Sequence, residues 1–451
     1  MEAERSYWRS EGTGVQAEHR PPDGRQVQDI VIGGGMAGVL IAYFLQRRGR
    51  EVVLLEQDRL GDGQTGGTTA KITAQHGLIY HRLIEDFGMA RAMQYAEQNR
   101  RAIGLYRQLM EERGIDCGME NRTAWLYTRV GQEALKREAE AADKLGFAVE
   151  LREESELPFE ISLAMGFRDQ ALFQPLCFLC GMGKGLEIHQ QTRVLDVRDH
   201  TVETDHGSLW GENIIFACHY PFIDRPGYYF ARMHAERSYV LALDNAQQLE
   251  GMYLGIDQAG LSLRMDGRRL LLGGGSHPTG ENRKGGSYAM LRSRAKELWK
   301  GSREAAAWSA QDCMTADGIP FIGRYSGTRD HWYVATGFNK WGMTSSMAAA
   351  VRISELICDG RSMGSEVFSP QRFSVGTDLR RGIRMGIRGA EGLARRLLDG
   401  EGHPTCPHMG CRLEWNPEEN SWDCPCHGSR FDREGHCLNG PARRGIEREE
   451  L

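Results

Sequence analysis

The chain has 451 residues, of which 40% are hydrophobic and 26% are charged, a composition that suits a globular protein of two or three domains. Its formal net charge of −5 gives no reason to expect a nucleic-acid partner. The charged N-terminus lacks the apolar region of a secretory signal, and the longest apolar stretch, residues 30–45, is too short to span a bilayer. We therefore expect a cytoplasmic protein with no integral membrane segment.

The spacing of apolar residues predicts an α/β chain that begins with a polar arm over residues 1–26. Residues 27–56 predict a strand, a helix from Met36 to Arg48 that stops at Gly49, and a second strand. The later segments are assigned by their period: helix over 81–145 and 284–307, strands over 190–220 and 228–275, and strand, glycine-rich turn and helix over 331–359.

Residues 379–397 place six apolar side chains on one helical stripe and arginines on the rest of the surface. The glycines within this stretch each cost a helix about 1 kcal/mol, so the helix needs packing to persist. A basic amphipathic helix can lie on a membrane. We favour the simpler interpretation, a helical linker over residues 366–402 that docks on the rest of the protein.

A dinucleotide-binding fingerprint follows the first predicted strand. Gly33, Gly35 and Gly38 have the spacing G-x-G-x-x-G, and Met36 and Ala37 open the helix that comes next. The glycines permit a tight turn and close approach of a pyrophosphate to the helix N-terminus. Glu56 ends the second strand, where a carboxylate can bind ribose hydroxyls. With strand, helix, strand and carboxylate in register, the motif predicts a dinucleotide site.

A second motif lies near the C-terminus, where five of the eleven cysteines fall in the last 46 residues. Cys406 and His408 form one C-x-H pair, and Cys424 and His427 form a C-x-x-H pair, with fifteen residues between the two pairs. One cysteine and one histidine on each of two loops is the ligand set of a Rieske [2Fe–2S] centre, with the cysteines on one iron and the histidines on the other. A structural zinc site is the alternative.

Several segments together carry a family resemblance: residues 29–38, 63–80, 213–222, 308–324 and 336–350. They resemble the D-amino-acid oxidase/glycine oxidase superfamily, and the chain is most similar to bacterial members that end in a Rieske domain. The resemblance covers residues 5–365 and 403–442. It implies FAD as the dinucleotide.

The resemblance also implies the architecture. We expect a glutathione-reductase-like FAD-binding fold interleaved with an antiparallel-sheet substrate domain, followed by a small C-terminal Rieske cluster-binding module. The expected boundaries are 27–85, 150–220 and 305–365 for the FAD-binding domain, 86–149 and 221–304 for the substrate domain, and 403–446 for the Rieske module. Only the helical linker precedes His403, so the module resembles the cluster-binding subdomain alone.

Further site residues are implied by position in the family motifs. Cys411 and Cys426 stand where many Rieske proteins have a disulfide that ties the two ligand loops together. The expected FAD contacts are Thr68, Thr69 and Ala70 near the diphosphate and flavin ring, Val194 at the adenine, and Asp317, Gly318, Gly337, Gly342, Met343 and Thr344 over the ribityl chain and ring.

Candidates for catalysis are weaker. His76, His219 and His277 lie near the expected flavin segments, but each is more often a hydrogen-bonded structural histidine. Arg237, Tyr239 and Arg264 lie on expected substrate-domain strands, where an arginine could clamp a substrate carboxylate or could simply be a solvated strand residue. The pair Cys177 and Cys180 has redox-like spacing but falls in an apolar helical run, which indicates core packing.

The resemblance implies an oxidoreductase that removes a hydride from a carbon bearing an amine, and the flavin supplies this chemistry. We expect an amine or amino-acid substrate and dehydrogenase behaviour, because the cluster accepts electrons one at a time and can pass them to a one-electron acceptor. Two alternatives stay open. The protein could relay electrons between partners, or it could use the cluster as a redox sensor without amine turnover.

Overall fold

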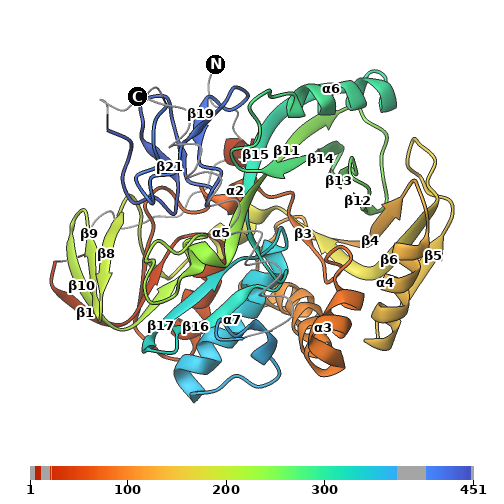
Figure 1. Ribbon diagram of the computed structural model, residues 1–451. Coiled ribbons are helices and arrows are strands. Elements are labelled where there is room, and N and C mark those ends of the chain that lie inside the picture. The colour runs from red at the N-terminus through yellow and green to blue at the C-terminus, as the bar shows by residue number, and fades with distance from the viewer. Residues whose placement is uncertain (1–5, 12–20, 22, 373–402, 448–451) are drawn as a thin grey trace.

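The computed structural model describes residues 6–11, 21, 23–372 and 403–447 (Figure 1). The expected linker helix falls on residues 373–402 and so lies outside the described residues. Within the part of the chain that is described, no helix has the length and hydrophobicity needed to cross a bilayer.

An eight-stranded sheet carries the N-terminal β-α-β unit. Its central strands run parallel in the order β17-β10-β1-β2-β7, with β16 antiparallel at one edge and the β8–β9 hairpin joined to β10. Helices α1 and α7 pack against each other beside this sheet. The strands are β1 Arg25–Ile32, β2 Val52–Leu55, β7 Glu187–His189, β8 Val194–Arg198, β9 Thr201–Thr204, β10 Gly207–Phe216, β16 Phe321–Ser326 and β17 Arg329–Thr336.

A nine-stranded, largely antiparallel sheet forms the second body, in the order β15-β11-β14-β13-β12-β4-β6-β3 with β5 paired to β6. Its long strands β11 and β15 are paired along almost their whole length. The strands are β3 Lys71–Ile72, β4 Glu120–Thr128, β5 Val149–Arg152, β6 Leu163–Leu172, β11 Met233–Asp244, β12 Met252–Gly255, β13 Ser262–Asp266, β14 Arg269–Pro278 and β15 Arg303–Thr315.

Helices cover the two sheets and connect them (Figure 1). The longest, α3, bends at Gly88, where the backbone leaves the helical region (φ +79°). The α-helices are α1 Met36–Arg47, α2 Gln64–Gly67, α3 Tyr80–Arg113, α4 Glu133–Lys144, α5 Pro175–Gly183, α6 Ser287–Leu298 and α7 Gly342–Asp359, and the short 3₁₀ turns are η1 Tyr7–Glu11, η2 Tyr229–Ala231 and η3 Glu366–Phe368.

Two predicted helical stretches contain strands. Strand β4 interrupts residues 81–145, and β15 begins inside residues 284–307. Both strands gain stability from non-local pairing, β4 with β6 and β12, and β15 with β11. Because such pairing depends on distant segments, the helical spacing around these strands was a poor guide to them.

The sheets also divide the chain differently from the expected domains. Strands β5 and β6 and strand β15 belong to the nine-stranded sheet, although residues 150–220 and 305–365 were expected in the FAD-binding domain. The N-terminal arm is not simply polar either, since Tyr7 and Trp8 are buried in the main core.

The C-terminal module is a four-stranded antiparallel sheet in the order β18-β19-β20-β21. It lies against the β15 end of the larger sheet and beside the β8–β9 hairpin (Figure 1). Its own small core includes Leu413 and Phe431. The strands are β18 Glu414–Asn416, β19 Ser421–Asp423, β20 Arg430–Phe431 and β21 Cys437–Asn439.

Candidate functional site

A cavity of about 270 Å³ lies at the carboxyl end of β1, where the glycine fingerprint turns into α1. Gly33 has φ +110°, and a Cβ there would lie 2.6 Å from the carbonyl oxygen of Ala217. A Cβ on Gly38 would lie 1.9 Å from the carbonyl oxygen of Gly33. Both positions therefore require glycine, as the fingerprint predicts.

The N-terminus of α1 opens onto this cavity. Gly35 lines the cavity, and a Cβ on it would meet only the Thr65 hydroxyl, at 3.2 Å. The Met36 amide donates to the Thr65 hydroxyl oxygen at 2.9 Å. An open glycine surface at a helix N-terminus is the cradle that a dinucleotide pyrophosphate needs.

Glu56 lies on the wall of the same cavity, as expected for a ribose-binding carboxylate. The Gly34 amide donates to its Oε2 at 2.6 Å, and the Asp58 amide donates to its Oε1 at 2.8 Å. Burial raises the pKa of Glu56 to about 7, against the opposing effect of these two amides. Hydroxyl groups of a bound ribose would offer this carboxylate further donors.

The other expected FAD residues divide into two groups. Thr68, Thr69, Val194, Gly342 and Met343 line this cavity or the one beside it. Six others are not among the described lining residues: Gly38, Ala70, Asp317, Gly318, Gly337 and Thr344.

Asp317 and Thr344 have structural partners instead. Asp317 binds the guanidinium of Arg372 with both carboxylate oxygens, at 2.7 and 2.9 Å. The Thr344 hydroxyl donates to the Thr73 carbonyl. These two residues therefore form hydrogen bonds within the protein and do not line either cavity.

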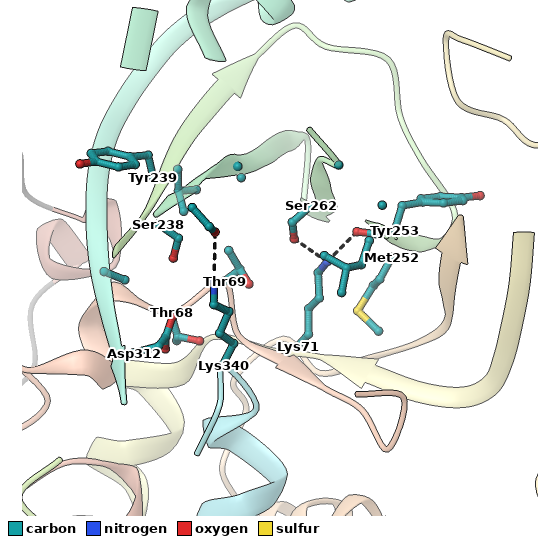
Figure 2. Close-up of a pocket in the computed structure, with 18 of the residues that line it drawn as sticks. Thr68, Thr69, Lys71, Ser238, Tyr239, Met252, Tyr253, Ser262, Asp312 and Lys340 are labelled. Atoms are coloured by element: carbon teal, nitrogen blue, oxygen red, sulfur yellow. Dashed lines mark hydrogen bonds between the residues drawn. The ribbon is translucent and has the colours of Figure 1, made fainter. Parts of the chain in front are cut away.

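A second cavity, of about 480 Å³, adjoins the first under the nine-stranded sheet (Figure 2). Six residues line both cavities: Gln64, Thr68, Asp312, Lys340, Gly342 and Met343. The two cavities therefore adjoin beside the glycine fingerprint, and the second has the size of a small-molecule site.

Two lysines extend into the second cavity from its floor (Figure 2). The Lys340 ammonium pairs with Glu236 at 3.1 Å and donates to the Ser276 hydroxyl at 3.0 Å. The Lys71 nitrogen donates to the Tyr253 carbonyl at 2.9 Å and to the Ser262 hydroxyl at 2.8 Å. Among the described residues, no carboxylate forms an ion pair with Lys71.

The environment of Lys71 disfavours its charge. Burial, and then the positive charge of Arg264, lower the pKa of the Lys71 ammonium to about 7. An anion that entered the cavity would remove this penalty. No sequence pattern marks this lysine, because its place in the cavity depends on the pairing of β3 with β6 and on the distant strands β12 and β13.

The predicted catalytic histidines are largely structural. His76 is buried, with Nδ1 2.6 Å from the Tyr95 hydroxyl and Nε2 2.6 Å from the Thr73 carbonyl, and it lines neither cavity. Burial lowers the pKa of His76 to about 3. His277 also lies outside both cavities, whereas His219 lines the first one with Nε2 3.3 Å from the Cys313 sulfur.

Neither candidate arginine faces the second cavity. Arg264 is fully buried and binds the Ala70 carbonyl at 3.0 Å and Asp266 at 2.8 Å. Arg237 pairs with Glu419 of the C-terminal module. Tyr239 lines the cavity, but its hydroxyl lies 3.1 Å from the same Glu419. A carboxylate clamp by Arg237 or Arg264 is therefore not what the structure offers.

The four predicted iron ligands come together at one end of the module. Cys406 and Cys424 are buried, and interaction with the neighbouring Cys424 thiol lowers the pKa of Cys406. The His408 and His427 rings lie 5.0 Å apart. The Nδ1 atom of each ring is buried and has no hydrogen-bond partner in the described structure, as expected of two imidazoles that bind iron.

The remaining two cysteines of the ligand loops, Cys411 and Cys426, form the expected disulfide, with their Cα atoms 6.6 Å apart. Their sulfurs are therefore not thiolate ligands. Two thiols and two imidazoles remain, and this mixed donor set suits a [2Fe–2S] cluster with histidines on one iron.

A pyrophosphate cradle that opens into a substrate-sized cavity, together with a Cys/His cluster site, defines a flavin-dependent oxidoreductase with an iron–sulfur module. Comparison with protein families agrees. Residues 30–356 match the family of FAD dependent oxidoreductases termed DAO, and residues 402–448 match the Rieske [2Fe-2S] domain. The chain belongs to the DAO family of FAD-dependent oxidoreductases and carries a C-terminal Rieske domain, so its cofactors are FAD and a [2Fe–2S] cluster.

One relative matches the full length. YhfW of Bacillus subtilis (strain 168), named for a Rieske 2Fe-2S iron–sulfur centre, is 35% identical over 100% of this chain and 98% of its own. Among solved structures, glycine oxidase from Geobacillus kaustophilus has a TM-score of 0.66 at 19% identity and covers 77% of this chain and 99% of its own. L-proline dehydrogenase from P. horikoshii has a TM-score of 0.65 at 19% identity and covers 78% of this chain and 98% of its own length. These two likenesses show the fold.

Proposed function

We propose that the protein is an amino-acid dehydrogenase that oxidises a C–N bond and passes the electrons from FAD to its own Rieske cluster. The observation that carries this proposal is the construction of the FAD cavity. Six residues of the C-terminal module, Cys437 to Gly440, Ala442 and Arg443, form part of its wall. A module that closes the flavin site is well placed to receive electrons from it.

The carbon bearing the amine gives up two electrons and a proton as hydride, and the amine nitrogen gives up a second proton, which leaves an imine that water hydrolyses. The flavin supplies the hydride chemistry, and the protein orients the substrate. The two electrons then leave one at a time through the cluster to a one-electron acceptor.

Lys71 supports an amino acid over a simple amine as the substrate. Its side chain lines the second cavity without a paired carboxylate among the described residues, and the positive charge of Arg264 acts on it. A substrate carboxylate would supply the missing negative charge, and a charge-assisted hydrogen bond is about twice as strong as a neutral one. The two solved structures above are named for glycine and L-proline, which are both amino acids.

The test is anaerobic reduction of the purified holoprotein with a panel of amino acids and the corresponding amines that lack the carboxylate. We expect amino acids to bleach the flavin absorbance and then to produce the EPR signal of a reduced mixed Cys/His cluster. Bleaching by the amines alone would remove the role of the carboxylate. Flavin bleaching with a cluster that stays oxidised would remove the transfer step.

A further inference from the structure

The junction between the flavin cavity and the cluster loops is built around one side chain of β15. We propose that Gln311 is the positioning residue that couples the two redox sites, because it ties the loop of the ligand His427 to the wall of the flavin cavity. This inference rests on the proposed function and names the contact through which the electrons of that reaction would pass.

Gln311 is 3% exposed and forms hydrogen bonds both to the cluster loop and to the cavity wall. Its side-chain Nε2 donates to the carbonyl oxygen of Gly428 at 2.9 Å, and Gly428 directly follows His427 in the chain. Its backbone amide donates to Oε1 of Gln64 at 3.1 Å. Gln64 lines both cavities, and its Nε2 donates to Asp312 at 3.0 Å. The cavity wall and a cluster ligand are thus joined through one residue.

The backbone of the cluster loop approaches the sheet as closely as it can at this point. Gly428 has φ +86°, and a Cβ on it would lie 2.2 Å from the Cβ of Ala235 on β11. The Gly428 amide also donates to the carbonyl of the ligand Cys424 at 3.0 Å. Electronic coupling falls steeply across gaps and less steeply across covalent and hydrogen bonds. A contact of this kind is therefore the expected path.

The histidine side of the cluster site faces the flavoprotein body. His408 Nε2 lies 3.1 and 3.2 Å from the two carboxylate oxygens of Asp224, and the His408 side chain is 5% exposed. The Phe230 ring lies 5.9 Å from the His408 ring and 5.6 Å from the His427 ring. Both residues belong to the segment between β10 and β11. The two histidines therefore pack against the flavoprotein body through Asp224 and Phe230.

The module has other anchors, so Gln311 can be changed without releasing it. Glu419 binds Arg237 and the Ser309 hydroxyl of the flavoprotein body, and Arg443 binds Asp196 at 3.0 Å. Each substrate oxidation delivers two electrons to the flavin, and the cluster accepts one. The junction is therefore used twice per turnover, with a one-electron acceptor oxidising the cluster in between.

The experiment compares Gln311→Met, which keeps the side-chain length but removes the donor, with Gln170→Met. Gln170 is also buried and hydrogen-bonded, to the Ala74 amide and the Arg168 carbonyl, but it lies on β6 and outside both cavities. Flavin reduction and cluster reduction are followed separately after anaerobic mixing with substrate. The EPR spectrum, the cluster midpoint potential and hydrogen exchange over residues 403–447 are measured for each protein.

We expect Gln311→Met to slow cluster reduction several-fold, because the loop that carries His427 loses its hydrogen bond to the strand beside the flavin cavity. The rate of flavin reduction, the midpoint potential of the cluster and hydrogen exchange over residues 403–447 should be the same in Gln311→Met as in Gln170→Met. Cluster reduction at the wild-type rate in Gln311→Met overturns the inference. If Gln311→Met loses its cluster, Gln311→Glu, which keeps the shape and lacks the donor when ionised, is judged by the same rates. A wild-type cluster that flavin never reduces refutes the proposed function instead.

Discussion

At the scale of single residues, the proposed recognition of an amino-acid carboxylate rests on Lys71. Lys71→Met removes the only charge that the cavity offers a carboxylate without a competing ion pair among the described residues. Loss of a hydrogen bond to a charged group costs about 1.5–3 kcal/mol, so we expect KM for the amino acid to rise roughly 10- to 150-fold. The measurement is steady-state kinetics with a dye acceptor, and Lys184→Met, an exposed lysine, is the control.

The pH dependence provides a second readout of the same residue. The pKa of Lys71 is lowered to about 7, so its ammonium form is present below that pH and is lost as the pH rises through it. Substrate carboxylate binding should therefore weaken above about pH 7 in the wild type. In Lys71→Met this component of the KM profile should be absent, and a profile unchanged by the substitution would contradict the assignment.

Gly35 decides whether FAD is retained. A valine there would project side-chain atoms from the N-terminus of α1 into the space expected for the pyrophosphate. We expect Gly35→Val to fold and to purify without yellow colour. Gly327→Val is the matched control, because a Cβ there meets no atom within 4 Å and the residue lies outside both cavities. FAD bound at wild-type stoichiometry to Gly35→Val would show that the fingerprint has only a structural role.

At the scale of elements, β11 holds the Rieske module through the buried pair Arg237–Glu419, and β15 adds the Ser309 hydroxyl. Burial would raise the pKa of Glu419, but Arg237 and Arg430 outweigh it and hold this pKa well below its usual range. The resulting stabilisation is complete above the unfolded-state pKa of about 4.3 and is lost only as the pH falls through the lower folded value. Docking through Glu419 should therefore be insensitive to pH over the physiological range.

Removal of one partner from this network leaves buried charge uncompensated, which typically costs about 3–5 kcal/mol. We expect Glu419→Gln to increase hydrogen exchange across residues 403–447 while exchange in β1 and α1 stays unchanged. Glu434→Gln, an exposed carboxylate of the same module, is the control. Equal exchange in the two variants would mean that other contacts dominate docking.

Elements also show which features the sequence predicts. The glycine fingerprint and the Cys/His pairs are local patterns, and the structure brings each set together as expected. Arg237 and Arg264 were reasonable clamp candidates on strands, but their partners are set by non-local packing, with Glu419 lying 182 residues from Arg237. Lys71, Gln64 and Gln311 were missed for the same reason, since their roles exist only once β3, α2 and β15 meet.

At the scale of the whole molecule, the flavoprotein body and the Rieske module together form the wall of the FAD cavity. The module closes the FAD cavity with residues 437–440, 442 and 443, and Arg443 also reaches the β8–β9 hairpin through Asp196. Arg372, near the end of the flavoprotein body, belongs to that body because it pairs with Asp317. A chain cut after Arg372 should therefore keep every described contact of the FAD fold except those made by the module.

The shared wall leads to a prediction for this shortened chain. The fingerprint, Glu56 and the second cavity all remain, so the protein should still bind FAD and be bleached by substrate. FAD affinity should fall, because part of the cavity wall is gone. Turnover with a one-electron acceptor should fall far more than flavin reduction does. Both are measured anaerobically on the full and shortened chains at saturating FAD. If acceptor turnover and flavin reduction fall by the same factor, the cluster lies off the route, because a lost electron path slows only the step after the flavin is reduced.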